Sequence, residues 1–250
     1  MAIEIFSRKE QKYLIKRSQY HELVRELAPY MRNDKNGVNG RYTVSSLYFD
    51  TLDKTIYFET KNKVKYRQKL RLRVYGEIES AMKSFFEIKQ KHDKVVHKRR
   101  LTMELEEANR YLMADAGGNL SGYRVSNLQV LKEIDYFRNL YGLAPEMVVS
   151  YDRHALHGQD DANLRMTFDF NLRCRKDELD LAKGSHGDFF MDADLVVLEV
   201  KVDHSVPLWL ARILQKLECE QRSASKFCAS TEMLAEELIL GAAEKETAEI

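Results

Sequence analysis

The stretch KYRQKLRLRVYG, residues 65–76, alternates between two kinds of side chain. Every second residue is a cation, in the order Arg67, Lys69, Arg71 and Arg73. The residues between them are almost all apolar, in the order Gln68, Leu70, Leu72 and Val74. A repeat of two residues predicts a β-strand rather than a helix. One face of this strand can be buried under helices, whereas the other carries cations about 7 Å apart.

The composition of the chain shows where its electrostatic function must come from. The chain has 250 residues, of which 44% are hydrophobic and 32% are charged, and its formal net charge is +1. This length suffices for one large domain with a sizeable core. A net charge so close to zero gives no reason to expect nonspecific attraction to nucleic acid or to a membrane. Any strong electrostatic function therefore depends on local segregation of charge.

The cysteines and the N-terminal residues bear on the cellular compartment. Cys174, Cys219 and Cys228 have no paired spacing, which argues against a disulfide framework and favours a reducing compartment. The first residues, MAIEIFSRKEQKYLI, lack the basic start and apolar core of a signal peptide. No apolar run approaches the roughly 18 residues of a transmembrane helix. We expect a soluble, cytoplasmic protein without direct membrane insertion.

Two kinds of periodic segment follow one another along the chain. Strand-like alternation lies near residues 5–14, 42–50, 65–75, 84–91, 94–103, 147–153, 164–170 and 195–202. Helical patterns lie at residues 18–31, 104–114, 128–141, 206–219 and 230–240. This order predicts an α+β domain built on a large, mostly antiparallel sheet. We expect residues 1–240 to form this single domain and residues 241–250 to form a polar C-terminal tail.

Most of the predicted strands repeat the charge pattern of residues 65–76. Three Glu-x-Lys pairs lie on strand faces: Glu10 with Lys12, Glu87 with Lys89, and Glu199 with Lys201. Further charged residues on such faces are Lys98, Arg100, Arg153, Arg165 and Asp169. The polar face of a single strand usually faces water. Six strands that concentrate arginine and lysine are unlike an ordinary solvent-facing sheet: if the sheet closes into a barrel, the charges line its interior and the apolar faces pack against helices on the outside.

A charged interior of this kind predicts a ligand. A dry interior cannot hold so many unpaired cations, because a buried charge must be paired or coordinated. A phosphate chain fits best, since its oxygens accept charge-assisted hydrogen bonds from arginine and lysine. Carboxylates would weaken anion binding unless they hold a divalent cation that bridges to phosphate. Glu199 and Glu87 are the best metal-ligand candidates, Glu10 and Asp169 come next, and simple pairing with neighbouring cations is the alternative.

Nine short blocks occur in an order that resembles a known family. They are RKEQKYLI, SLYFDT, RQKLRLRVYG, FFEIKQK, HKRR, YDRHAL, LRMTFD, VVLEVK and SKFCAS. Together they resemble the catalytic domain of the vacuolar transporter chaperone (VTC) polyphosphate polymerases, a stand-alone form of which we expect here. That domain belongs to the triphosphate tunnel metalloenzymes, a CYTH-like superfamily. The resemblance runs from about residue 5 to residue 232.

The resemblance implies a closed eight-stranded antiparallel β-barrel with helices packed on the outside, whose tunnel binds phosphates with basic side chains and uses Mn²⁺ or Mg²⁺. It implies catalytic contacts from Arg71, Arg73, Lys98, Arg165 and Lys201. It implies further phosphate-binding contacts from Lys12, Lys89, Arg153 and Lys226, with Glu199 as a metal ligand. The strand alternation alone adds Lys69 to the predicted phosphate-binding residues, whereas Lys226 is predicted from the resemblance alone. Glu87 and Glu10 remain further candidates for the metal.

The implied reaction is transfer of the γ-phosphoryl group of ATP to a polyphosphate chain, with release of ADP. The chain has one Glu-x-Lys at residues 10–12, where hydrolytic relatives of this superfamily usually carry Glu-x-Glu-x-Lys, and this favours the polymerase. One alternative is a tunnel hydrolase of triphosphate or nucleoside triphosphate, with Glu10 or Glu87 as general base. Another is a non-catalytic polyphosphate-binding module. Nucleic acid is disfavoured because exposed aromatic residues are not interleaved with the cations.

Overall fold

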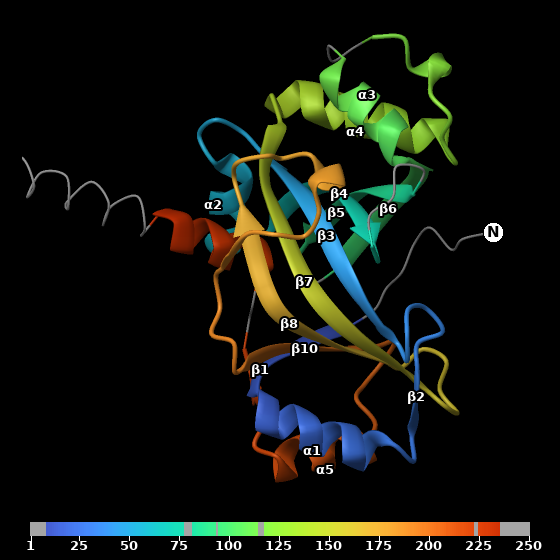
Figure 1. Cartoon of the computed structure of the whole chain (residues 1–250), viewed down its shortest axis with the longest axis vertical. Coiled ribbons are helices and arrows are strands. Elements are labelled where there is room, and N and C mark those ends of the chain that lie inside the picture. Colours follow the sequence, from blue (N-terminus) through green and yellow to red (C-terminus); the bar gives the residue numbers. More distant parts are fainter. Residues whose placement is uncertain (1–8, 78–81, 94, 115–117, 223–224, 236–250) are drawn as a thin grey trace, which may run out of the picture.

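The computed structural model describes residues 9–77, 82–93, 95–114, 118–222 and 225–235. Within them, a single antiparallel sheet of eleven strands is accompanied by helices at both of its ends and along one side, as Figure 1 shows. The α+β class predicted from the sequence is therefore confirmed. No helix among these residues is long and apolar enough to cross a membrane.

The strands follow the alternating segments of the sequence closely. They are β1 (Lys9–Lys16), β2 (Met31–Asn33), β3 (Arg41–Asp50), β4 (Tyr66–Tyr75), β5 (Lys83–His92), β6 (Val95–Glu104), β7 (Ala144–Gly158), β8 (Arg165–Arg175), β9 (Asp188–Phe189), β10 (Leu195–Val202) and β11 (Glu220–Gln221). The eight predicted strands correspond to β1, β3–β8 and β10. The short strands β2, β9 and β11 were not expected, because two or three residues are too few to display an alternation.

The hydrogen-bonded order of the strands corrects the expectation of a closed eight-stranded barrel. The order is β11-β1-β10-β8-β7-β3-β4-β5-β6, with β2 added beside β7 and β9 beside β8. Within the described part of the chain, no backbone pairing joins β6 at one end of this order to β1 or β11 at the other. The sheet therefore has eleven strands and is open. Side chains nevertheless meet across the opening, since Lys89 Nζ of β5 lies 3.8 Å from a carboxylate oxygen of Glu10 in β1.

The helices are α1 (Arg17–Leu27), α2 (Thr55–Lys61), α3 (Leu105–Met113), α4 (Leu128–Tyr141) and α5 (Leu208–Lys216). Residues 226–235 are also helical. The helix predicted at 230–240 therefore begins earlier than expected, and residues 236–240 and the predicted tail at 241–250 lie outside the described residues. The unexpected helix α2 is short. Its first backbone N–H groups are satisfied by Asp50, whose Oδ1 accepts from Ile56 N at 2.8 Å and whose Oδ2 accepts from Tyr57 N at 3.0 Å.

Two apolar clusters bury the outer face of the sheet. One lies between strands β3–β7 and helices α2, α3 and α4, and it includes Leu70, Leu72 and Val74 from the stretch that predicted the fold. The other lies between strands β1, β8 and β10 and helices α1 and α5. Figure 1 shows α3 and α4 at one end of the molecule, α1 and α5 at the other end, and α2 along one side. Because successive strand residues point to opposite faces, burying the apolar face directs the charged face inward.

Replacing a buried residue of β4 is expected to destabilise the fold. Leu72 is 0% exposed, so Leu72→Ala removes buried methyl groups and leaves a cavity, which lowers the free energy of unfolding by about 2 to 5 kcal/mol. Leu52→Ala is the matched control, because Leu52 is 94% exposed, and it is expected to change that free energy by less than about 0.5 kcal/mol. Urea denaturation of both variants measures the difference. Equal effects would contradict the assignment of the buried face.

Candidate functional site

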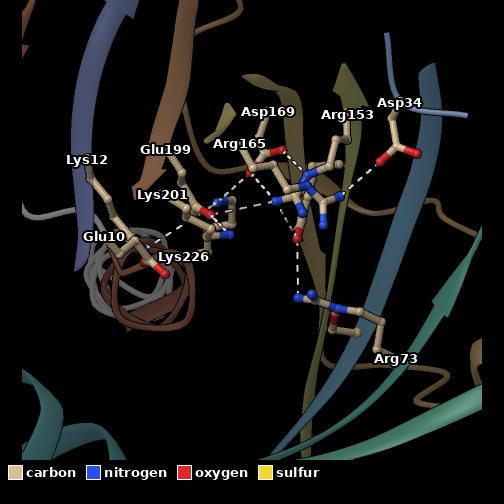
Figure 2. A network of polar contacts seen from close by, with 12 residues as sticks. Glu10, Lys12, Asp34, Arg73, Arg153, Arg165, Asp169, Glu199, Lys201 and Lys226 are labelled. Atoms are coloured by element: carbon tan, nitrogen blue, oxygen red, sulfur yellow. Dashed lines mark hydrogen bonds and ion pairs between the residues drawn. The ribbon is translucent and has the colours of Figure 1, made fainter. Parts of the chain in front are cut away.

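The inner face of the sheet, opposite the two apolar clusters, carries most of the residues singled out from the sequence. Its cations are Lys12, Lys69, Arg71, Arg73, Lys89, Lys98, Arg100, Arg153, Arg165 and Lys201, joined by Lys226 of the C-terminal helix. Its carboxylates are Glu10, Asp34, Glu87, Asp169 and Glu199. Figure 2 shows side chains from several strands pointing toward one another across this face. Cations outnumber carboxylates, so the face attracts anions.

Two Glu-x-Lys pairs lie opposite each other on neighbouring strands. In the antiparallel pairing of β1 and β10, Glu10 is opposite Lys201 and Lys12 is opposite Glu199. Lys12 Nζ lies 3.3 Å from an oxygen of each carboxylate, and Lys201 Nζ donates to Glu199 Oε2 at 3.0 Å. Each carboxylate therefore has a lysine as its cross-strand neighbour, and these pairs form because the register brings opposite charges together.

Lys226 connects the C-terminal helix to this group. Its Nζ donates to Glu199 Oε1 at 3.2 Å and lies 2.7 Å from Asp169 Oδ2 (Figure 2). Arg153 holds Asp169 from the other side in a bidentate pair, with Nε–Oδ1 at 2.6 Å and Nη2–Oδ2 at 2.8 Å. Against the effect of burial, Lys201, Lys226 and Lys12 hold the pKa of Glu199 well below its usual range. Lys226, which only the resemblance recommended, thus lies beside the other cations, although its helix carries no strand alternation.

Among the described residues, no group of three or more potential ligands is arranged to hold a metal. Glu10 and Glu199 come closest to the predicted site, because they share Lys12 and Glu10 is partly exposed. One or two carboxylates that leave room for water and substrate phosphate are the ligand set that Mg²⁺ usually takes. Of these two residues, the partly exposed Glu10 is the more open to a metal that is carried together with phosphate. Cations already contact both oxygens of Glu199 and of Asp169, so a metal on either would have to displace one of them.

The pairing of β4, β5 and β6 arranges the remaining cations in two rows across the strands. Lys69, Lys89 and Lys98 are direct neighbours in one row. Arg71, Glu87 and Arg100 are direct neighbours in the next. The first row contains cations alone, and the second has a carboxylate at its centre.

Glu87 lies at the centre of a cluster of cations. Arg71 Nε donates to Glu87 Oε2 at 2.6 Å, Arg100 Nε donates to Glu87 Oε1 at 2.7 Å, and Lys98 Nζ also contacts Oε1. These contacts occupy both oxygens of a carboxylate that is almost completely buried. The geometry favours pairing with cations, the alternative that the sequence left open, over metal binding by Glu87.

All three lysines of the first row have a lowered pKa, because burial disfavours their charged form. Burial lowers the pKa of Lys69 to about 8. Burial, with help from Arg71 and Arg100, also lowers the pKa of Lys98 to about 8, although Glu87 opposes the change. A buried ammonium group among other cations gains stability when an anion approaches. Anion binding at these residues is therefore coupled to their protonation.

Arg73 is a buried cation whose partners are neutral. Its Nε donates to Ser46 Oγ at 2.9 Å and its Nη2 donates to Tyr151 OH at 3.2 Å. Among the residues that the structure describes, it forms no direct ion pair with a carboxylate. Against the effect of burial, Arg73 and Arg100 lower the pKa of Tyr75 to about 7, because they stabilise the phenolate. The negative charge near Arg73 comes from Glu87, which other cations share, and from an ionised Tyr75, so a bound phosphate would stabilise Arg73 further.

Arg165 lies at the edge of the inner face, next to a pocket. Its Nη2 donates to Asp34 Oδ2 at 3.2 Å and to Tyr42 OH at 3.1 Å. The pocket has a volume of about 310 Å³ and is lined by Arg32, Asp34, Lys35, Asn36, His157 and Arg165. The sequence did not identify Asp34, because it lies between the predicted helix at residues 18–31 and the predicted strand at residues 42–50, where no periodicity reveals which way a side chain points. Arg100 was recognised as a charged face residue but was not assigned to the site.

The lowered pKa values of Lys69 and Lys98 predict that anion binding weakens as the pH rises. Lys69 and Lys98 are protonated below pH 8 and lose charge as the pH rises through about 8, and ionisation of Tyr75 acts in the same direction. The affinity for inorganic tripolyphosphate should therefore fall between about pH 7 and about pH 9. Titration calorimetry measures this fall, together with proton uptake on binding above pH 8.

A double variant provides the control for this pH dependence. Arginine keeps its proton throughout this range, so Lys69→Arg combined with Lys98→Arg should flatten the decline in affinity. An equally steep decline in the double variant would show that other groups cause it.

Comparisons with known proteins bear on the family and the fold of this chain. The sequence model of the VTC domain matches residues 7–235. No curated protein shows a significant sequence match. Among solved structures, a candidate adenylate cyclase from Bacillus halodurans superposes with a TM-score of 0.54 at 15% identity, covering 89% of this chain and 96% of that one.

Two further solved structures are more distant. A candidate adenylate cyclase from Vibrio parahaemolyticus has a TM-score of 0.47 at 12% identity, covering 90% of this chain and 98% of that one. A candidate adenylyl cyclase from Hippeastrum, described as having a dominant triphosphatase activity, has a TM-score of 0.46 at 15% identity and covers 89% and 93%.

These comparisons differ in what they establish. At 15% identity, the likeness to the Bacillus halodurans protein shows a shared fold alone. The match to the VTC domain extends over nearly the whole chain and includes every described strand and helix. It confirms the resemblance seen in the nine sequence blocks: the chain belongs to the VTC domain family.

Proposed function

We propose that this protein transfers phosphoryl groups on the inner face of its sheet, and that it builds polyphosphate from ATP with release of ADP. The single observation that carries the proposal is the excess of buried and half-buried cations over carboxylates on that face, with Arg73 the clearest example. A buried cation without a carboxylate partner is costly unless an anion joins it. Membership of the VTC domain family makes a phosphate chain the anion that we infer.

The side chains suit a reaction that depends on positioning. Phosphoryl transfer passes through a loose transition state, and charge neutralisation supplies most of the catalysis. We infer that Arg71, Arg73, Lys98 and Arg165 hold the β- and γ-phosphates of ATP in line with the end of the acceptor chain. Because these donors are already held in position by neighbouring groups, little reorganisation is needed when charge develops. No protein nucleophile is required.

The group around Glu199 has a separate role in this proposal. Lys12, Lys201 and Lys226 would contact phosphate oxygens, while Glu10 and Glu199 would hold Mn²⁺ or Mg²⁺ together with the substrate. A divalent ion bound there would neutralise charge on the phosphate oxygens. Lys89 and Arg153 flank the same carboxylates and complete the phosphate-binding set.

Hydrolysis of triphosphate is the second candidate function. Glu10 favours it, because this carboxylate is partly exposed on the inner face, where it could orient a water molecule. Glu87 is a weaker base candidate, since three cations cover it. Incubation with ATP and Mn²⁺ distinguishes the functions: long-chain polyphosphate supports the polymerase, orthophosphate alone supports the hydrolase, and tight binding without turnover supports a binding module.

Loss of Arg73 should abolish most of the activity. In the proposed reaction the buried Arg73 side chain donates hydrogen bonds to the reacting phosphates, and Arg73→Met removes this donor. We expect kcat to fall by about 100-fold or more, which is the usual effect of removing one donor to a transition-state oxyanion. Polyphosphate formed from ATP and Mn²⁺ is measured on gels over time.

The matched control for this variant is Arg99→Met. Arg99 lies in β6 on the outer face, where its Nη1 donates to Glu133 Oε1 at 3.0 Å, and its loss should leave synthesis nearly unchanged. Undiminished synthesis by Arg73→Met would remove the main support for the proposal.

A further inference from the structure

We propose that Glu87 is a positioning residue, whose buried carboxylate holds Arg71, Lys98 and Arg100 together as one phosphate-binding subsite. The inference rests on the proposed function, because it takes the ligand of these cations to be a phosphate chain. It assigns to Glu87 a role other than metal binding, and it adds Arg100 to the site.

The arrangement of these four side chains has two levels. The side chain of Glu87 is 1% exposed, whereas those of Arg71, Lys98 and Arg100 are 22%, 34% and 36% exposed. The carboxylate therefore lies beneath the cations, and each cation still presents part of its surface. A ligand that reaches this part of the inner face meets three cations before it meets the carboxylate.

The strand register makes this arrangement possible. Glu87 is directly opposite Arg71 on β4 and Arg100 on β6, so both guanidinium groups reach it within one row. Lys98 belongs to the neighbouring row, two residues along β6, and reaches Glu87 diagonally. Pairs that are opposite or diagonal across antiparallel strands lie close enough for long side chains to meet.

The chemical need for Glu87 follows from the charges around it. Three cations gathered at one point repel one another, and burial adds to the cost of each charge. Charge-assisted hydrogen bonds to one carboxylate offset that cost and also orient the donors. Without the carboxylate, the two arginines would turn apart and Lys98 would lose its proton more readily.

Each of the two arginines also donates a hydrogen bond to a tyrosine hydroxyl. Arg71 Nη1 donates to Tyr48 OH at 3.4 Å, and Arg100 Nη2 donates to Tyr75 OH at 2.9 Å. Each guanidinium group is therefore held by the carboxylate and by a phenol at the same time. This preorganisation gives both groups a defined orientation, which suits the fixed spacing of oxygens along a phosphate chain.

The Glu87 carboxylate could position the cations, or it could only balance their charge. These two roles predict opposite changes in the affinity of Glu87→Gln for tripolyphosphate. Glu87→Gln removes one negative charge from an anion-binding face. If the carboxylate only reduces the local positive charge, the variant should bind tripolyphosphate more tightly. If the carboxylate positions the cations, the variant should bind more weakly in spite of its extra positive charge.

The test is titration calorimetry of the full chain with inorganic tripolyphosphate and a chelator, so that a metal plays no part. We expect Glu87→Gln to bind about tenfold more weakly than the wild type, which corresponds to about 1.4 kcal/mol. Glu133→Gln is the matched control, because it removes the same charge from an exposed pair with Arg99 on the outer face. Its affinity should equal that of the wild type.

Thermal unfolding of the free proteins shows whether Glu87→Gln folds. If it does not fold, a second variant still tests the inference. Glu87→Asp keeps the charge but shortens the reach to Arg71 and Arg100, so positioning predicts weaker binding and charge balance predicts no change. Wild-type affinity in Glu87→Asp, or tighter binding in a folded Glu87→Gln, would overturn the inference alone. A wild-type protein that binds no tripolyphosphate would overturn the proposed function as well.

Discussion

The pairing of buried carboxylates with a larger number of cations is the interaction on which the rest of this structure depends. Glu87, Asp169 and Glu199 each contact two or more lysines or arginines on the inner face. Without them, so many cations could not be held so close together. With them, a positive excess remains, because the carboxylates are too few to match every cation. The same contacts thus stabilise the fold and leave it able to bind an anion.

This constraint explains why the helices lie where they do. A sheet whose inner face is charged must bury its other face, and the two apolar clusters do so with α2, α3 and α4 on one part and α1 and α5 on another. The C-terminal helix has a second role, because Lys226 extends from it to Asp169 and Glu199. Packing and charge pairing therefore depend on each other: a shift of that helix would also remove one cation partner from each of two buried carboxylates.

Local patterns predicted the strands because alternation is a property of neighbouring residues. Leu70 and Leu72 belong to the buried cluster, and Arg71 and Arg73 lie on the other face, as the repeat of two required. The same reasoning could not find Asp34, since a loop has no repeat, nor α2, since it is too short to display one. The prediction of a closed barrel was wrong for a related reason. Alternation specifies which side chains share a face of a strand, but closure depends on whether the first and last strands exchange backbone hydrogen bonds.

The sequence by itself determined where the eight longer strands lie, which face of these strands is charged, and the family to which the chain belongs. Only the tertiary structure decided which carboxylate pairs with which cation. Arg165 and Asp34 are 131 residues apart, and Lys12 meets Glu199 only through the register of β1 against β10. Equal Glu-x-Lys motifs therefore acquired different environments, with Glu10 partly exposed and Glu87 buried beneath three cations. The physical reason is that the pKa and the partners of a charged group depend on its neighbours in space, which strand register and packing create.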